Sequence, residues 1–176
     1  PCPPDVLAAS AQPMVNHRGS EFANILGNVS EGLKWVFGTS SEVFCLTASG
    51  TGGLEAAIVN VLSPGDLILS ISIGSFGERF ANIAKTYGAN VETYAVEWGK
   101  AADPEEIAAR LEANPNYKAI LVTHNETSTG VTNPLKEIAE VAKSYDCLVI
   151  VDAVSSLSSI PCPVEEWGLD VVVSGS

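Results

Sequence analysis

The sequence has few basic residues and no long apolar segment. Lys and Arg together number 9 against 21 Asp and Glu, which gives a formal net charge of −12. A surface this acidic repels the phosphate backbone of nucleic acids, so a nucleic-acid partner is not expected. The apolar runs are of strand length and fall far short of the roughly 18 residues that a membrane-spanning helix needs. We therefore expect no membrane segment either.

Histidine and cysteine are also scarce and scattered. The two histidines, His17 and His124, lie far apart, and the 4 cysteines form no C-x-x-C pair, so no metal site is expected. Cys45 and Cys147 lie in apolar, strand-like runs. We expect buried free thiols in a reducing compartment rather than disulfides. This favours a cytoplasmic protein, with a peroxisome or another organelle as the alternative.

Short apolar runs alternate with helical patterns along most of the chain. The expected strands are residues 43–47, 67–71, 90–96, 118–123, 147–152 and 170–174. The expected helices are residues 52–62, 76–87, 104–113 with Asp103 as the N-cap, and 134–145. The S-P-G-D segment at 63–66 reads as a turn, with Asp66 as a turn residue. This alternation predicts an α/β fold with a mostly parallel sheet that is covered by helices on both faces.

Small, hydroxylated and glycine-rich segments follow several of the expected strands. They are S-G-T-G-G at 49–53, G-S-F-G at 74–77, H-N-E-T-S-T-G at 124–130, D-A-V-S-S at 152–156 and S-G-S at 174–176. In open parallel sheets, ligands bind at the carboxyl ends of the strands. We therefore expect the polar chemistry of the chain at one edge of the sheet.

Each of these segments has two readings from its residues alone. S-G-T-G-G opens a helix and is either an anion site built from free backbone N–H groups or a plain tight turn with an N-cap. It is neither a Walker loop nor a G-x-G-x-x-G motif. Asp152 is either a solvated strand end or a charge that faces a ligand. Phe76 is either a core aromatic or part of a site, and H-N-E-T-S-T-G could be only a capped loop.

Seven stretches in order carry a family resemblance. They are P-x-x-V-L-A-A at 3–9, H-R-G-S-E-F at 17–22, S-G-T-G-G-L-E-A-A at 49–57, S-P-G-D at 63–66, H-N-E-T-S-T-G-V at 124–131, V-D-A-V-S-S-L at 151–157 and E-W-G-L-D-V-V-V-S-G-S at 166–176. The chain resembles the class V aminotransferases of pyridoxal-phosphate fold type I. It is most similar to the alanine–glyoxylate and serine–glyoxylate (serine–pyruvate) aminotransferases.

The resemblance implies pyridoxal 5′-phosphate as cofactor and gives roles to particular residues. Gly50, Thr51 and Gly52 match the loop that binds the cofactor phosphate, where the helix dipole adds about 0.3–1 kcal/mol for an anion. Asp152 matches the catalytic aspartate that pairs with the pyridine nitrogen and keeps it protonated, so that the ring accepts electrons.

Three further residues match positions around the cofactor ring. Thr127 matches a hydroxyl residue that bonds the cofactor near its phenolic oxygen, and Val154 matches the residue on one face of the ring. Phe76 takes the position of an aromatic that stacks on the opposite face, where relatives often have Trp. Asn125 and residues 174–176 lie nearby without an assigned role.

The resemblance also implies what the complete enzyme does. It would transaminate alanine or serine with glyoxylate or pyruvate, as a homodimer. In the family, S-G-S is followed by Gln-Lys, and that Schiff-base lysine binds the cofactor covalently; this chain is expected to lack it and to be inactive alone. Residues 1–40 are expected to form an N-terminal and dimer-contact region, and residues 41–176 the N-terminal part of a truncated large domain, with the small C-terminal domain absent. Trp35, Val36 and Phe37 suit a dimer contact, with core packing as the alternative.

Two other functions remain as alternatives. One is another class V pyridoxal-phosphate enzyme, either cysteine desulfurase-like or a so-called soluble hydrogenase subunit. The other is a non-catalytic, phosphate-binding α/β module.

Overall fold

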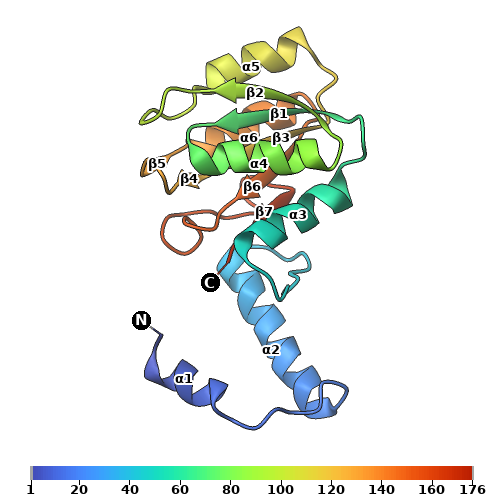
Figure 1. The fold of residues 1–176 in the computed structure, drawn as a ribbon, viewed down its shortest axis with the longest axis vertical. Helices are drawn as coiled ribbons and strands as arrows, with labels where there is room; N and C mark the ends of the chain where they lie inside the picture. Colours follow the sequence, from blue (N-terminus) through green and yellow to red (C-terminus); the bar gives the residue numbers. More distant parts are fainter. Residues whose placement is uncertain (1, 176) are drawn as a thin grey trace.

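A five-stranded parallel sheet forms the centre of the protein in a computed structural model that describes residues 2–175 (Figure 1). Its strands are β1 (Leu67–Ser72), β2 (Asn90–Ala95), β3 (Ala119–Thr123), β6 (Leu148–Asp152) and β7 (Val171–Val173), in the order β2-β1-β3-β6-β7. Every pairing is parallel. The near-continuous burial of β1, β3 and β6 is what a sheet covered on both faces requires.

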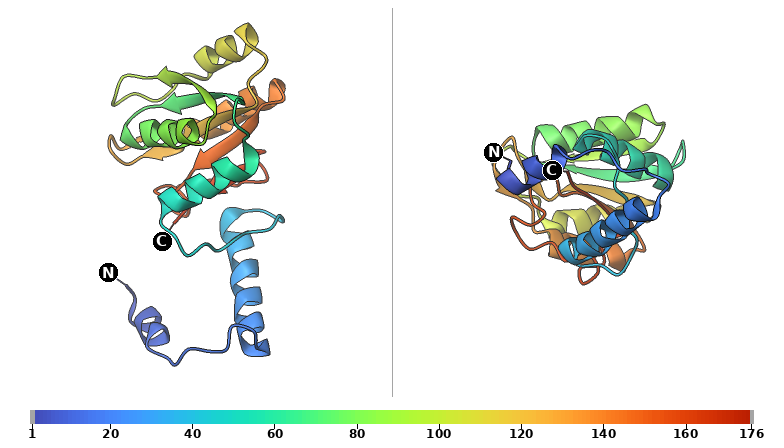
Figure 2. Two further views of the ribbon diagram at one scale, coloured as in Figure 1. Left: turned by 45° about the vertical axis from the view of Figure 1, so that its right-hand side comes forward. Right: turned by 90° about the horizontal axis from the view of Figure 1, so that it is seen from below.

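Helices cover both faces of this sheet, as Figure 2 shows from below. On one face α3 (Gly50–Val61) and α4 (Ser75–Thr86) bury a core that includes Ile58, Phe80 and Leu121. On the other face α5 (Pro104–Ala113) and α6 (Leu135–Ser144) bury a second core around Ile107 and Ile138. The predicted fold class is confirmed, and five of the six expected strands and all four helices lie within two residues of their expected bounds.

Two local predictions are confirmed by their hydrogen bonds. The side chain of Asp103 accepts a hydrogen bond of 2.9 Å from the N–H of Glu105 and so caps α5. In the turn before β1, the Asp66 carboxylate accepts one of 2.7 Å from the N–H of Ser63, and Gly65 has a φ of 91°, which a residue with a side chain rarely adopts.

The strand expected at residues 43–47 is wrong. This segment has no regular structure and is largely exposed; Phe44 is 82% and Leu46 55% accessible. An apolar run becomes a strand only where another strand pairs with it, and among residues 2–175 this run has no such neighbour. Cys45 is consequently exposed, contrary to the expectation of a buried thiol, whereas Cys147 and Cys162 are buried.

Two helices at the N-terminus were not expected from the sequence. They are α1 (Pro4–Ser10) and α2 (Ser20–Phe37), and Figure 1 shows α1 and most of α2 projecting away from the sheet. Neither helix contains a buried residue, and α2 exposes apolar side chains, with Trp35 85% accessible. Core packing of Trp35 is therefore excluded within the described residues. None of the helices in residues 2–175 combines the length and apolarity of a bilayer-crossing segment.

The remaining strands form a small hairpin beside the main sheet. Residues Asn125–Glu126 (β4) pair antiparallel with Val131–Thr132 (β5). The hairpin folds the segment that follows β3 back on itself. It thereby places residues 125–130 next to the start of α4, which contacts β4.

Candidate functional site

A cavity of about 380 Å³ lies at the carboxyl edge of the parallel sheet. It lies at the topological switch point of the sheet: the chain passes from β1 to β2 on one side, and then to β3 on the opposite side of β1. The residues that line it come from the start of α3, the first turn of α4, and the segments at the ends of β3 and β6. They are Ser49, Gly50, Thr51, Leu54, Phe76, Arg79, Thr123, Asn125, Thr127, Asp152, Val154 and Ser155.

Six of the seven predicted site residues therefore line one cavity. The exception is Gly52, which is not part of the lining; a Cβ at this position would lie 2.8 Å from Cβ of Ala48. Of the three residues that match the phosphate loop, only Gly50 and Thr51 reach the cavity with any atom. Ser176, the last residue of the S-G-S segment, lies outside the described residues.

The start of α3 offers backbone donors to the cavity. Ser49 is the N-cap residue, but its side chain makes no capping hydrogen bond, and the first N–H groups of a helix have no partner within the helix. Gly50 lets the start of α3 pack close to the segment after β6, since a Cβ at this position would lie 2.7 Å from Cγ2 of Val154. An anion at this end of the cavity would meet free N–H groups and the positive end of the helix dipole.

Asp152 is a buried carboxylate at the end of β6. It is 4% accessible, so the solvated-strand-end reading is wrong. Its Oδ1 accepts a hydrogen bond of 3.0 Å from the N–H of Val154. Burial raises the pKa of this carboxyl; the Val154 N–H opposes the rise, the Glu126 carboxylate adds to it, and Arg79 opposes it. Because burial disfavours the charged form of this carboxyl, a cationic or proton-donating ligand group nearby would stabilise that form.

Apolar surface lines the cavity next to these polar groups. Phe76 lies in the first turn of α4, and the guanidinium carbon of Arg79 is 4.8 Å from the centre of its ring, a cation–π contact. Val154 follows Asp152 by two residues and is 41% accessible. A flat ring bound between the α3 start and Asp152 would find apolar side chains from both α4 and the segment after β6.

Glu126 has a role that the sequence analysis missed. It is completely buried, and its carboxylate accepts hydrogen bonds from the N–H groups of Phe76 (3.1 Å) and Gly77 (3.0 Å) and from the hydroxyl of Ser128 (2.6 Å). It thus caps α4 from a distant part of the sequence. A Cβ on Gly74, the N-cap residue of α4, would lie 2.6 Å from both Cγ of Glu126 and Oγ of Ser128. The sequence carries no local signal for this role, because Ser75, directly before the expected helix start at Phe76, suits an ordinary N-cap.

Asn125 is fixed on the other side of the same hairpin. Its Nδ2 donates to Oγ of Ser155 over 2.9 Å, and that hydroxyl donates to the Asn125 carbonyl over 2.8 Å. The Thr132 hydroxyl donates to Oδ1 of Asn125 over 3.0 Å. Thr127, which the resemblance places near the cofactor, directly follows these two anchored residues, is exposed and lines the cavity.

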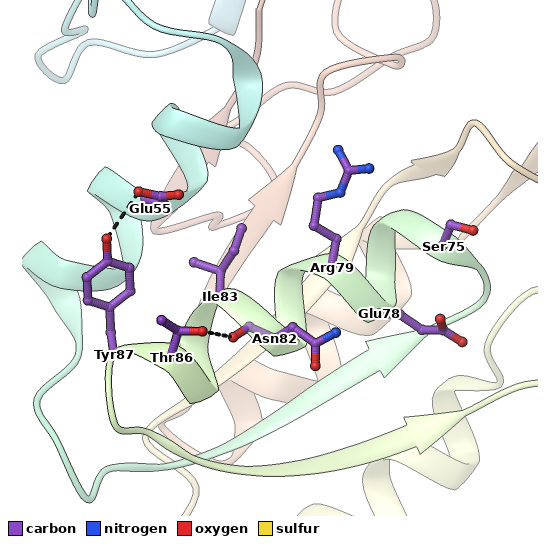
Figure 3. Close-up of a pocket in the computed structure, with 8 residues that line it drawn as sticks. All are labelled: Glu55, Ser75, Glu78, Arg79, Asn82, Ile83, Thr86 and Tyr87. Atoms are coloured by element: carbon purple, nitrogen blue, oxygen red, sulfur yellow. Dashed lines mark hydrogen bonds between the residues drawn. The ribbon is translucent and has the colours of Figure 1, made fainter.

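A second cavity of about 400 Å³ lies on the outer side of α3 and α4 (Figure 3). Its lining is mixed: it includes polar side chains such as Glu55, Glu78 and Asn82 as well as apolar surface, and the Tyr87 hydroxyl donates to Glu55 across it over 3.1 Å. The buried polar atoms without partners lie elsewhere in the described chain. Of these two cavities in residues 2–175, the one at the sheet edge combines a buried charge, free helix N–H groups and an apolar lining.

His124, next to the cavity, is a buried neutral histidine. It is 3% accessible, its ring meets Trp167 edge-on at 6.1 Å, and burial lowers its pKa to about 4. Between pH 6.5 and pH 4 the unfolded chain binds a proton that the folded chain excludes, so stability falls as the pH falls. We expect His124 to contribute a drop of roughly 2 kcal/mol in the free energy of unfolding from pH 7 to pH 5, measured by urea unfolding, and the raised pKa of Asp152 to act in the opposite direction.

Two variants isolate this effect. His124→Gln is expected to remove most of the difference between pH 7 and pH 5, because the titrating group is gone. His17→Gln changes an exposed histidine and is expected to leave the difference as it is. An unchanged pH dependence in His124→Gln would show that another group causes it.

Comparisons with known proteins point to one family. The family model for the class-V aminotransferases matches residues 6–176. A soluble hydrogenase 42 kDa subunit from Anabaena cylindrica is 48% identical over all of this chain and 47% of its own length. An alanine–glyoxylate aminotransferase from Drosophila melanogaster is 34% identical over 99% of this chain and 45% of its own length.

A solved structure agrees with the sequence relatives. The crystal structure of a ureidoglycine–glyoxylate aminotransferase from Bacillus subtilis superposes with a TM-score of 0.94 at 34% identity, and covers 98% of this chain and 44% of its own chain. The chain thus spans about half the length of the curated relatives it matches.

Proposed function

Because the chain belongs to the class V aminotransferase family, we propose that the full-length protein transfers an amino group from alanine or serine to glyoxylate or pyruvate, with pyridoxal 5′-phosphate as cofactor. The observation that carries this proposal is the cavity at the sheet edge. It brings a helix N-terminus and the buried carboxylate of Asp152 to the same space, although the two are about one hundred residues apart in the sequence.

The described residues fit this cofactor. The free N–H groups at the start of α3 suit a phosphate, and Asp152 suits a protonated ring nitrogen. Phe76 and Val154 offer apolar surface to the ring. The cavity volume lies in the range of about 300–1,000 Å³ that is usual for small-molecule sites.

When bound, the cofactor supplies a ring that accepts electrons from the substrate carbon. The residues of this chain hold and tune that ring. Asp152 keeps a proton on the ring nitrogen, and the positive charge gained there reverses the effect of burial on its pKa. The Phe76 and Val154 side chains exclude water from the ring faces, and the Thr127 hydroxyl orients the ring edge.

The names of relatives favour glyoxylate as the acceptor. Besides the alanine-dependent relative, others at 36% and 34% identity are named serine–glyoxylate aminotransferase and L-aspartate–glyoxylate aminotransferase. The acceptor is the same in these names, whereas the donor differs. We therefore place glyoxylate ahead of pyruvate, and keep alanine or serine as the proposed donors.

The lysine that binds the cofactor covalently is proposed to follow Ser176, as the second residue of a Gln-Lys pair. The position of β7 supports this, because Val173 pairs in register with Asp152 on β6. The segment that leaves β7 therefore starts at the edge of the cavity. The residues encoded after Ser176 test this part directly, and a sequence without lysine there would remove it.

The proposed homodimer rests on α1 and α2. Ile25, Leu26 and Val29 on α2 are 46%, 44% and 43% accessible, and Trp35 is 85% accessible. Apolar residues gathered on a helix that packs so little against its own chain are usual at subunit contacts. A second copy of the full-length protein is the proposed partner of this surface.

The function is tested on the full-length protein loaded with pyridoxal phosphate. Alanine, serine and aspartate are each offered with glyoxylate, and glycine and the keto acid of the donor are quantified. We expect turnover with alanine or serine, and a dimer in sedimentation equilibrium of the same preparation. Cofactor binding without amino transfer from any donor would exclude the transaminase proposal. Release of sulfide from cysteine would favour a desulfurase instead.

A further inference from the structure

One fully buried side-chain hydroxyl in the lining of the cavity has no hydrogen-bond partner. Thr123 ends β3 and is 2% accessible, and its Oγ1 makes no hydrogen bond with any described residue. Buried polar atoms nearly always have a partner, so each exception needs a cause. Five other buried atoms in residues 2–175 share this state, on Ser70, Arg110, His124, Thr129 and Ser156, but none of these residues lines the cavity.

Thr123 lies beside Asp152. The two residues are partners in the parallel pairing of β3 with β6, and in-register residues on neighbouring parallel strands point to the same face of the sheet. Neighbouring strands are only about 4.8 Å apart, so a side-chain rotation brings a threonine hydroxyl within reach of an aspartate on the next strand. Both residues line the cavity.

One carboxylate oxygen of Asp152 is available to accept a hydrogen bond. Its Oδ1 accepts from the N–H of Val154, whereas Oδ2 accepts no hydrogen bond from any described residue. A hydroxyl can donate to this oxygen while the same carboxylate faces a protonated ring nitrogen. In the structure, Thr123 and Asp152 lie on the same face of the sheet, and no hydrogen bond joins the hydroxyl to the carboxylate.

We propose that Thr123 is a positioning residue of this site: in the occupied cavity its hydroxyl donates to the Asp152 carboxylate and holds it toward the ring nitrogen of the bound cofactor. This inference rests on the proposed function and adds a residue to it. Burial keeps water away from the carboxylate, and the Thr123 hydroxyl supplies a hydrogen-bond donor in its place. It therefore favours the charged form of Asp152, which is the form that pairs with a protonated ring.

The decisive variant is Thr123→Val, which keeps the branched shape and removes the hydroxyl. In the full-length protein we expect pyridoxal phosphate affinity to fall about tenfold, the effect of losing one charge-assisted hydrogen bond. The acid limb of the pH profile of cofactor binding is expected to move to higher pH. The other charged groups that act on Asp152, Glu126 and Arg79, are unchanged in this variant. Urea unfolding of the cofactor-free protein is expected to show unchanged or higher stability, because no hydrogen bond is lost there.

Two controls complete the test. Thr123→Ser restores the hydroxyl and is expected to bind the cofactor like the wild type. Ser70→Ala removes a partnerless buried hydroxyl from β1, away from the cavity, and is expected to leave affinity unchanged.

Three results would overturn the proposal: wild-type affinity in Thr123→Val, no recovery in Thr123→Ser, or a loss of stability in the cofactor-free Thr123→Val protein. The loss of stability would show that the Thr123 hydroxyl already has a hydrogen-bond partner in the cofactor-free protein. If the wild type itself binds no pyridoxal phosphate, the proposed function fails instead.

Discussion

Asp152→Asn is expected to lower the turnover number of the full-length protein at least about 100-fold, the scale on which loss of one preorganised electrostatic contact acts. Asparagine has nearly the same shape as aspartate but no charge, so it cannot keep a proton on the ring nitrogen. Burial already penalises the charge of Asp152, since it raises the pKa of the carboxyl. The variant is therefore expected to fold with unchanged or higher stability.

Steady-state kinetics and urea unfolding together check this prediction. Glu112→Gln neutralises an exposed carboxylate on α5 and is expected to change neither quantity. Asp152→Glu keeps the charge but displaces it, so its turnover is expected to fall between those of the wild type and the asparagine variant. Turnover of Asp152→Asn near the wild-type value would show that this carboxylate is not the partner of a ring nitrogen.

Glu126→Ala is expected to destabilise the protein by roughly 3 kcal/mol. The substitution removes a buried carboxylate that accepts from the N–H groups of Phe76 and Gly77 and from Ser128. The first turn of α4 then has buried donors without acceptors. Because α4 holds Phe76 against the cavity, the affinity for pyridoxal phosphate is expected to fall as well.

Denaturant unfolding measures this effect through the midpoint, with an unchanged slope against denaturant concentration. Ser128→Ala serves as the comparison within the same cap. It removes a hydroxyl that donates to Glu126 over 2.6 Å and accepts from the N–H of Ser75 over 3.1 Å, but it leaves the Glu126 carboxylate in place, and about 1 kcal/mol is expected. Glu126→Gln keeps one carbonyl oxygen and is expected to lie between the two. A stability change below about 0.5 kcal/mol in Glu126→Ala would contradict the capping role.

The sheet and its covering helices could be predicted because their signals are local. Strands buried on both faces are apolar at nearly every position, as in residues 119–122, and few other structures produce such runs. Asp103 followed by Pro104 marks a helix start within two residues of sequence. The edge rule for parallel sheets then placed residues from three separate segments, those after β1, β3 and β6, in one cavity. The S-G-T-G-G segment also lines this cavity, although residues 43–47 before it form no strand.

The predictions that were wrong or missing concern features that depend on tertiary contacts. Residues 43–47 have the apolar pattern of a strand but no partner strand among the described residues, and α2 exposes the apolar residues that would normally mark a core helix. The capping role of Glu126 depends on a helix about 50 residues earlier in the sequence. The exposure of Thr123 to the cavity depends on its register with β6, which the apolar run it ends does not reveal.

Binding of pyridoxal phosphate in the cavity around Asp152 is the inference on which the others depend. Equilibrium dialysis of the cofactor-free, full-length protein against pyridoxal phosphate and, separately, against a nicotinamide dinucleotide decides it. We expect stoichiometric retention of pyridoxal phosphate, reduced in Thr123→Val, and no retention of the dinucleotide. Retention of the dinucleotide, or of neither compound, would overturn this inference.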